Sequence, residues 1–264
     1  MGYPTYEGKH ALAPFISPSE YQEYLRANFG WAGLPPLVGT ILTFQPSFFR
    51  EVVKAQGWER LRVPTSALGD YYIMQTSGGA VGLSGGFGVG APAATNRLED
   101  IGASGCTRFV AIGFAGGLQP GLHAGDVVLC DRAIRDEGVS HHYAPWAKYA
   151  TPSATLTARL HEAMATAGLE HRSGATWTID TPYRETVEEL RRYQQEGVLT
   201  VEMEAAALAT VCQVRGFEFA TAFTISDTLA DPEWRPQFHH DAAAIGLARL
   251  LDAAIAALTG AARG

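Results

Sequence analysis

The feature that most constrains the fold is an alternation of strand and helix patterns along the whole chain. Two short apolar runs flank Ser77-Gly78-Gly79 and predict a hairpin. Other apolar runs predict buried strands at 37–44, 108–114, 126–130 and 217–225. Helical spacing or composition predicts helices at 91–101, 153–167, 184–195, 202–215 and 241–258. This order is typical of an α/β domain. Because no linker or repeat divides it, residues 1–264 are predicted to form a single domain.

The composition is that of an ordinary globular protein with an apolar core, and it narrows the class of partner. The chain is 47% hydrophobic and 18% charged, with a formal net charge of -7. An acidic balance argues against nucleic acid as a partner, because binding to a phosphate backbone favours a basic face. The same charge does not oppose a small uncharged ligand.

Cysteine and histidine spacing gives no indication of a metal or disulfide site. The three cysteines, Cys106, Cys130 and Cys212, are widely spaced and form no CxxC pair. The pairs His141-His142 and His239-His240 are poor chelates, because neighbouring residues of a strand point to opposite faces. We therefore expect neither a metal nor an organic cofactor.

The location in the cell is predicted from the start of the chain and from its apolar stretches. The first residues have neither the basic start nor the apolar run of a signal peptide. We expect no apolar stretch as long as the roughly 20 residues that a membrane span needs. We therefore expect a cytoplasmic protein without membrane association.

Small residues end three of the predicted strands, at Ser84-Gly85-Gly86, Ala115-Gly116-Gly117 and Ser226-Asp227. Ligands of open α/β sheets bind where strands end, so a site is expected there. The first of these ends continues through Gly88 into Gly90-Ala91-Pro92, a glycine-rich loop whose backbone can approach a ligand closely. The alternative interpretation is a set of tight turns, which composition alone does not exclude.

Two acidic segments carry the candidate chemistry. Glu202 and Glu204 flank Met203 within an apolar stretch, and a carboxylate can accept hydrogen bonds from the two neighbouring hydroxyls of ribose. Compensation of a helix dipole would explain one of these acids more easily than both. Asp227 directly follows a hydrophobic strand, where partial shielding from water suits a general acid. Its alternative role is that of a turn or N-cap residue.

Several segments, in this order, resemble the nucleoside phosphorylase family, which includes purine nucleoside phosphorylase, uridine phosphorylase and adenosylhomocysteine-type nucleosidases. Gly90-Ala91-Pro92 is similar to the end of its Gly-x-Gly-x-Pro turn. Residues 112–120, followed by 125–128, are similar to its central strand and turn. The most specific segment is 201–206. Residues 140–145 resemble the uridine phosphorylase branch, whereas Ser226-Asp227 resembles the purine branch.

The resemblance implies a fold and a set of roles. The fold would be a single three-layer α/β/α domain with a central mixed, partly barrel-like sheet. The implied catalytic residues are Glu204, on the ribose hydroxyls, and Asp227, which would protonate or hydrogen-bond the leaving base. The further substrate-binding residues implied are Glu202, Met203, Phe114, Ala115, Gly116, Tyr183, Gly88 and His10. His10 would reach in from a neighbouring subunit, which implies a homodimer or a hexamer built as a trimer of dimers.

The implied reaction is cleavage of the N-glycosidic bond of a nucleoside to free base and ribose 1-phosphate. The similarity at Asp227 implies that the nucleoside is a purine nucleoside. Inorganic phosphate would be the co-substrate. However, the family's phosphate site uses three arginines and a Gly-Asp-Pro loop, and here residues 43–49 (TFQPSFF) occupy the place of the loop. Ala111 stands at the position of one of the family's arginines, and Phe114 stands where the family has a small hydroxyl residue. Hydrolysis by water is therefore the alternative reaction, and a nucleoside-binding protein without catalysis is the alternative of another class.

Overall fold

The computed structural model describes residues 6–55, 57–63, 70–230, 234–236 and 241–260. Its strands are β1 (Gly39–Thr43), β2 (Glu59–Leu61), β3 (Asp70–Thr76), β4 (Gly79–Gly85), β5 (Arg108–Gly117), β6 (Val127–Asp136), β7 (Tyr149–Ala150), β8 (Arg172–Ile179), β9 (Thr200–Glu202), β10 (Glu218–Thr228) and β11 (Arg235–Pro236). Its α-helices are α1 (Pro18–Phe29), α2 (Pro46–Val52), α3 (Ala91–Ala103), α4 (Ser140–Tyr143), α5 (Ala154–Thr166), α6 (Val187–Gln195), α7 (Ala205–Arg215) and α8 (Asp241–Thr259). Short 3₁₀ helices are η1 (Lys9–Ala11) and η3 (Pro182–Arg184).

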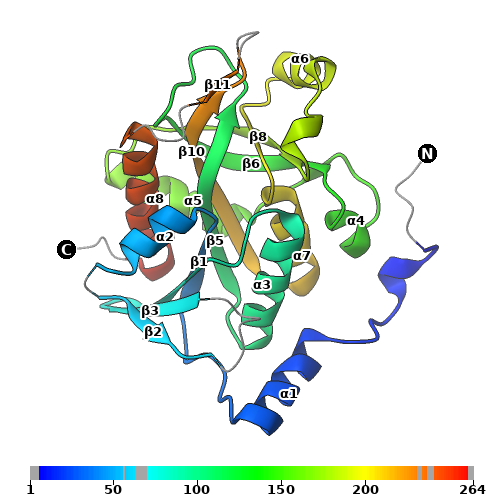
Figure 1. Ribbon diagram of the computed structural model, residues 1–264, viewed down its shortest axis with the longest axis vertical. Coiled ribbons are helices and arrows are strands. Elements are labelled where there is room, and N and C mark those ends of the chain that lie inside the picture. Colours follow the sequence, from blue (N-terminus) through cyan, green and yellow to red (C-terminus); the bar gives the residue numbers. More distant parts are fainter. Residues whose placement is uncertain (1–5, 56, 64–69, 231–233, 237–240, 261–264) are drawn as a thin grey trace.

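One mixed sheet connects the strands in the order β11-β10-β6-β8-β9-β5-β1-β4-β3-β2, with β7 paired to β6. β10 also pairs with β5, so that β10, β6, β8, β9 and β5 form a closed ring (Figure 1). β1, β4, β3 and β2 extend the sheet from β5 outside this ring. The prediction of a mixed, partly barrel-like sheet is confirmed.

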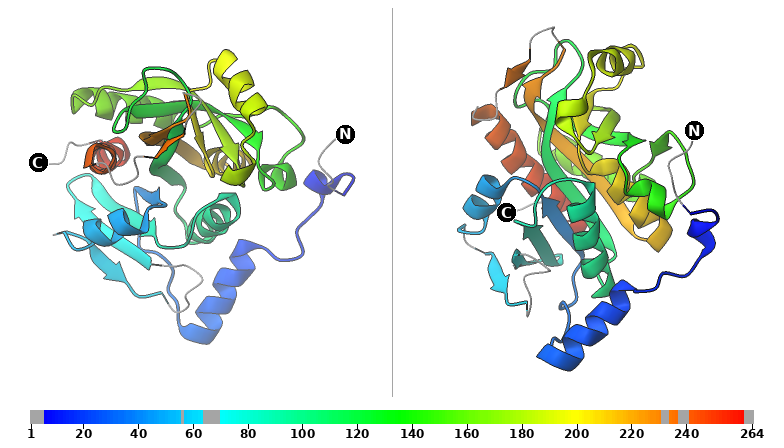
Figure 2. Two further views of the ribbon diagram at one scale, coloured as in Figure 1. Left: turned by 45° about the horizontal axis from the view of Figure 1, so that its top comes forward. Right: turned by 45° about the vertical axis from the view of Figure 1, so that its right-hand side comes forward.

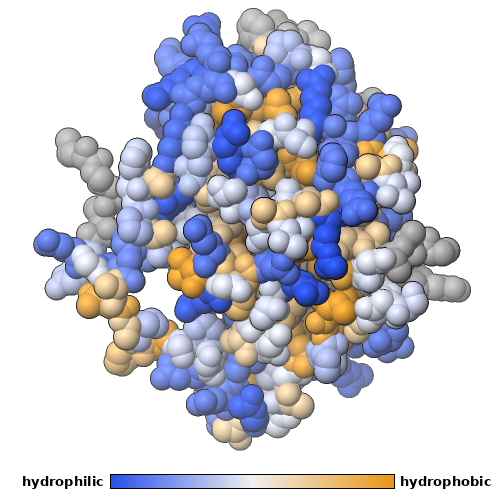
Figure 3. Space-filling view, turned by 180° about the vertical axis from the view of Figure 1, so that it is seen from behind, coloured by the Kyte–Doolittle hydropathy of each residue, from blue (hydrophilic) through white to orange (hydrophobic). Residues whose placement is uncertain are grey.

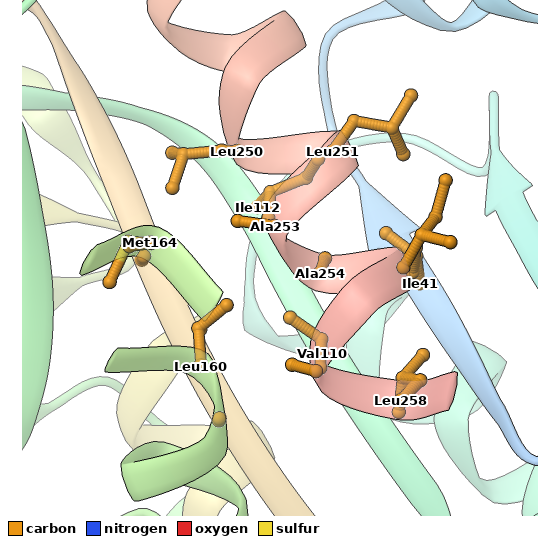
Figure 4. Close-up of a cluster of buried hydrophobic side chains, with 14 of the residues drawn as sticks. Ile41, Val110, Ile112, Leu160, Met164, Leu250, Leu251, Ala253, Ala254 and Leu258 are labelled. Atoms are coloured by element: carbon orange, nitrogen blue, oxygen red, sulfur yellow. The ribbon is translucent and has the colours of Figure 1, made fainter. Parts of the chain in front are cut away.

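Helices cover both faces of this sheet, because side chains of its central strands alternate between them. Ile41 of β1 and Val110 of β5 belong to a core cluster with α5 and α8, whereas Leu42 and Phe109 belong to a second cluster with α3 and α7. Figure 4 shows Leu160 of α5 and the residues of α8 around the first cluster. The two views of Figure 2 show the same helices on either side of the sheet, so the predicted three-layer arrangement is confirmed.

α8 corrects one expectation from the sequence. By length and composition it is apolar enough to cross a membrane, so the statement that no stretch approaches this length is wrong. The fold explains its composition, because 56% of its apolar window is buried and Leu247 and Leu250 pack in the core. Polar and apolar side chains are interspersed on the face seen in Figure 3.

The predicted hairpin is formed by β3 and β4, and most predicted helices and strands lie within a few residues of their expected bounds. The main difference is at the predicted helix 202–215, which begins only at Ala205. Glu202 belongs to β9, and its neighbour Val201 pairs with Gly116 of β5. β8 was missed by the sequence analysis, and Asp227 lies within β10 rather than after it. His239 and His240 lie outside the described residues.

Candidate active site

A cavity of about 480 Å³ lies where the parallel strands β1, β5 and β10 end. Its walls combine aromatic, small and acidic side chains from segments distant in the sequence. Its lining residues are Phe44, Gln45, Val89, Phe114, Ala115, Gly116, Pro182, Tyr183, Glu185, Val201, Glu202, Met203, Glu204, Ser226, Asp227, Leu229 and Trp234. Two of the three small-residue strand ends expected to form a site, Ala115-Gly116 and Ser226-Asp227, line this cavity, whereas Ser84-Gly85-Gly86 does not and the loop after it reaches the cavity at Val89.

Eight of the ten predicted site residues line this one cavity: Phe114, Ala115, Gly116, Tyr183, Glu202, Met203, Glu204 and Asp227. The structure does not bring the other two to it within this chain. Gly88 is exposed with a φ of 101°, and its neighbour Val89 lines the cavity instead. His10 lies against α4, where its Nε2 is 3.0 Å from the carbonyl oxygen of His141.

Glu202 and Glu204 are both buried, but their surroundings differ. Oε2 of Glu202 accepts hydrogen bonds of 2.7 Å from the backbone N–H groups of Glu204 and Ala205. Its Oε1 accepts a hydrogen bond from the hydroxyl of Thr178. These contacts join β9 to the first turn of α7 and β8, so Glu202 holds the backbone that carries Glu204. Oε1 of Glu204 accepts a hydrogen bond from the N–H of Gly90, in the glycine-rich loop.

Burial governs the protonation of both carboxyls. Burial raises the pKa of Glu202 from 4.5 to about 7, although its hydrogen bonds act in the opposite direction. Burial, together with the charge of Glu202, raises the pKa of Glu204 to about 8. Hydrogen bonds donated to Glu204 by a ligand would stabilise its charged form and lower this pKa.

Asp227 is positioned by β10 and by two hydrogen-bond donors. The pairing of β10 with β5 shifts between Ile225 and Asp227, which turns this acid toward the cavity. Oδ1 accepts a hydrogen bond of 2.8 Å from the hydroxyl of Ser226, and Oδ2 accepts one of 2.9 Å from Nε1 of Trp234. A Cβ at the neighbouring Gly116 would lie 2.5 Å from Cδ1 of Leu229 and 3.1 Å from Cγ1 of Val201, so this position of the cavity wall favours a residue without a side chain.

Glu185 is a cavity residue that the sequence analysis missed. It is half-buried, and burial and then the charge of Asp227 raise its pKa to about 7. In sequence it belongs to a polar stretch typical of a surface loop, so only its position two residues after Tyr183 connected it with the site. Tyr183 itself is 99% exposed and lies at the mouth of the cavity.

The side of the cavity next to β1 is apolar. Phe44 packs edge-on against Phe87, with ring centroids 5.9 Å apart, and Val89 and Phe114 complete this wall. Gln45 also lines it. Among the described lining residues there are four carboxylic acids and no arginine, lysine or histidine.

Three arginines of the first half of the chain have contacts outside this cavity. Arg97 is buried and donates to Oγ of Ser84 at 2.6 Å. Arg108 pairs with Glu218 at 2.8 Å, and Arg60 with Asp70 at 2.6 Å.

Comparison with known proteins finds relatives that are named as nucleoside phosphorylases. The family model described as the phosphorylase superfamily matches residues 50–256. A uridine phosphorylase of Haemophilus influenzae is 30% identical over 143 residues, which are 49% of this chain and 57% of the relative. A uridine phosphorylase of Thermococcus kodakarensis is 30% identical over 145 residues, covering 49% and 51%.

A DeoD-type purine nucleoside phosphorylase of Caldanaerobacter subterraneus is also similar, with 31% identity over 155 residues, 56% of this chain and 65% of the relative. The chain thus spans about half to two thirds of the length of these curated relatives. Because the family model covers most of the chain, and relatives from both branches match it, the chain belongs to the nucleoside phosphorylase family.

Proposed function

We propose that this protein cleaves the N-glycosidic bond of a nucleoside in the cavity between β1, β5 and β10. The observation that carries the proposal is that Glu204 and Asp227, both buried, face one cavity of about 480 Å³. That volume lies within the range of ordinary small-molecule sites. Trp234, which contacts Asp227, and Tyr183, at the mouth of the cavity, provide flat surfaces for a base.

The proposed roles follow from the charges that develop during cleavage. Breaking the bond leaves positive charge on the ribose and negative charge on the base. Glu204 accepts hydrogen bonds from the ribose hydroxyls, and its carboxylate stabilises the positive charge. Asp227 donates a proton to the leaving base, a contribution worth about 10²–10⁴-fold in rate. We propose a purine base, because Asp227 with Ser226 corresponds to the purine branch of the family.

The experiment is base release from a panel of purine and pyrimidine nucleosides, followed by chromatography. Asp227→Asn should lose turnover but still bind the nucleoside, because the substitution keeps the shape and removes the proton. Asp131→Asn, at an exposed position of β6, is the matched control and should behave as the wild type. Intact nucleoside recovered from every incubation would instead show a binding protein, and normal turnover by Asp227→Asn would refute the role of Asp227.

The acceptor of the ribosyl group has two candidates. Phosphate is the acceptor that the family resemblance implies, and it would give ribose 1-phosphate. Hydrolysis is the second candidate, and the absence of a cationic side chain among the described lining residues favours it. A phosphate dianion without arginine partners is poorly stabilised in a closed acidic site.

We also propose that the working unit is a homodimer or a hexamer built from dimers. The N-terminal segment supports this, since it lies along the outside of the molecule and Phe15 is 97% exposed (Figure 1). Sedimentation velocity should give a dimer or larger species, and Phe15→Ser should weaken the association. A monomeric wild type at working concentration would refute this.

A further inference from the structure

We infer that Thr178 is a positioning residue, which holds Glu204 in place through Glu202 and through the first turn of α7. The inference rests on the proposed cleavage of a nucleoside, in which Glu204 accepts hydrogen bonds from the ribose. Thr178 is fully buried and does not belong to the lining of the cavity. It therefore acts through other residues rather than on the substrate.

The sheet places Thr178 at the end of β9. Parallel pairing of β8 with β9 sets it beside Glu202, and its hydroxyl donates a hydrogen bond to Oε1 of that residue. The same hydroxyl oxygen accepts a hydrogen bond of 3.0 Å from the backbone N–H of Ala206, in the first turn of α7. The hydroxyl of Thr176 is farther from Oε1, at 3.5 Å. One side chain of β8 thus joins the carboxylate of Glu202 to the helix that follows Glu204.

The start of α7 explains why these contacts matter. The first N–H groups of a helix have no partner within it, and the side chain of the N-cap residue commonly accepts from them. Glu204 is the N-cap residue of α7, but its side chain makes no capping hydrogen bond. Oε2 of Glu202 accepts instead from the N–H groups of Glu204 and Ala205, each at 2.7 Å, and Thr178 accepts from Ala206. Because two other side chains cap the helix, the carboxylate of Glu204 remains available to face the cavity.

The same contacts act on the ionisation of Glu204. Burial raises the pKa of Glu202 to about 7, and the hydroxyl of Thr178 acts against burial by donating to the charged form. Burial and then the charge of Glu202 raise the pKa of Glu204 to about 8. By favouring the charged form of Glu202, Thr178 therefore keeps the pKa of Glu204 high.

The other titratable groups around these two carboxyls come from β6 and from the lining of the cavity. Glu137 directly follows β6, and its charge adds to the burial that raises the pKa of Glu202. The thiol of Cys130 on β6 is buried, and burial and then the charge of Glu202 raise its pKa. Glu185 and Asp227 line the same cavity. All four groups remain when one hydroxyl is removed from β8, so a substitution there tests the hydroxyl alone.

The first test compares Thr178→Val with Thr221→Val in the cleavage of adenosine. Thr221 is a matched control, because it is also fully buried on a strand and its hydroxyl donates to the carbonyl oxygen of Ala111. In Thr178→Val the maximum of kcat/KM should fall about tenfold, because the backbone that carries Glu204 loses a capping acceptor. Thr221→Val should lose stability but keep kcat/KM within about twofold of the wild type.

The pH dependence separates a positioning role from a merely structural one. Without its donor, Glu202 is charged less often, so Glu204 should ionise at a lower pH. The pH of half-maximal kcat/KM should therefore be lower in Thr178→Val than in the wild type. Thr178→Ser keeps the hydroxyl and should keep the wild-type midpoint. An unchanged midpoint in Thr178→Val, or the same shift in Thr178→Ser, would overturn the inference.

A second test reads the ionisation of Glu204 without catalysis. The protein is labelled with ¹³C at the side-chain carboxyls of glutamate, and the signal of Glu204 is the one lost in Glu204→Gln. Its titration midpoint should be lower in Thr178→Val than in the wild type and unchanged in Thr221→Val. An unchanged midpoint in Thr178→Val would overturn the inference even if nucleosides are cleaved. Absence of base release from every nucleoside would refute the proposed function, while this titration would still decide the role of Thr178.

Discussion

The backbone N–H of Gly90 donates a hydrogen bond to Oε1 of Glu204, across a sequence separation of 114 residues. The glycine-rich loop and the predicted ribose carboxylate are therefore connected before any ligand binds. Gly90 has a φ of 93°, a conformation that favours glycine, so the contact depends on this residue type. Glu204 is thus held from two sides, by Gly90 and by the backbone that Glu202 fixes.

Catalysis should follow the ionisation of Glu204. Burial and the charge of Glu202 raise its pKa to about 8, and only the charged form accepts hydrogen bonds from both ribose hydroxyls. The kcat/KM for adenosine should therefore rise with pH, reach half of its maximum near pH 8 and level off above that pH. In Glu204→Gln this rise should be absent and kcat/KM lower by roughly a hundredfold. Initial rates across the neutral range test this, and a variant with the wild-type profile would contradict it.

Stability should show the opposite dependence on pH. The folded-state pKa of Glu204 is raised above its unfolded value of 4.5, so its favourable contribution is complete below pH 4.5 and is lost as pH rises through about 8. Glu204→Gln should flatten this decline in the free energy of unfolding, measured by denaturant titration at acidic, neutral and alkaline pH. Glu51→Gln, on an exposed side chain of α2, should keep the wild-type slope. Equal slopes in wild type and Glu204→Gln would show that another group is responsible.

Trp234 should compete with the base for Asp227. Its indole N–H occupies Oδ2 of Asp227 at 2.9 Å, and a base must displace it to reach that oxygen. Trp234→Phe keeps an aromatic ring and removes this donor, so adenine should bind roughly fivefold more tightly. Calorimetry of adenine binding measures the difference. The gain should vanish in an Asp227→Asn background, and a gain that persists there would assign the effect to packing.

Glu185 should influence the choice of base. It lines the cavity, and the charge of Asp227 contributes to its raised pKa. Its ionised carboxylate accepts hydrogen bonds but cannot donate them. It should therefore favour a base with an exocyclic amino group. Glu185→Gln should lower the ratio of kcat/KM for adenosine to that for inosine by about tenfold. Glu188→Gln, exposed on α6, is the control, and an unchanged ratio in Glu185→Gln would remove this role.

Local patterns predicted most helices and strands, and the rule that ligands bind where strands end predicted a site at Ala115 and Asp227. The layers and the place of Glu204 in the same site were implied by the resemblance to the family. The sequence did not predict that Glu202 lies on β9, because a three-residue strand has no recognisable period of its own. The pairing of Gly116 with Val201 is a contact distant in sequence, and it outweighed the helical pattern of the alanines that follow.

The residues missed at the site share another cause. Glu185 and Trp234 belong to polar loops, and Gln45 belongs to a segment noted only for the family residues it lacks. Their importance depends on what they face: Asp227 for the first two, and an apolar wall for Gln45. Such relations arise only from the packing of β1, β5 and β10. The place of His10, against α4 in this chain, leaves its predicted role in a neighbouring subunit as a prediction.

The closed ring of β10, β6, β8, β9 and β5 has a consequence for which parts of the cavity can change. Asp227, Glu202 and Gly116 all stand on ring strands, whose registers constrain one another around the circle. Gln45 follows β1, which attaches to the ring by one edge only. The walls of the cavity that stand on ring strands are therefore constrained by every pairing around the circle, whereas the wall after β1 is constrained from one side only. Substitutions in the loop after β1 should therefore change the shape of the cavity without a shift in the register of the ring.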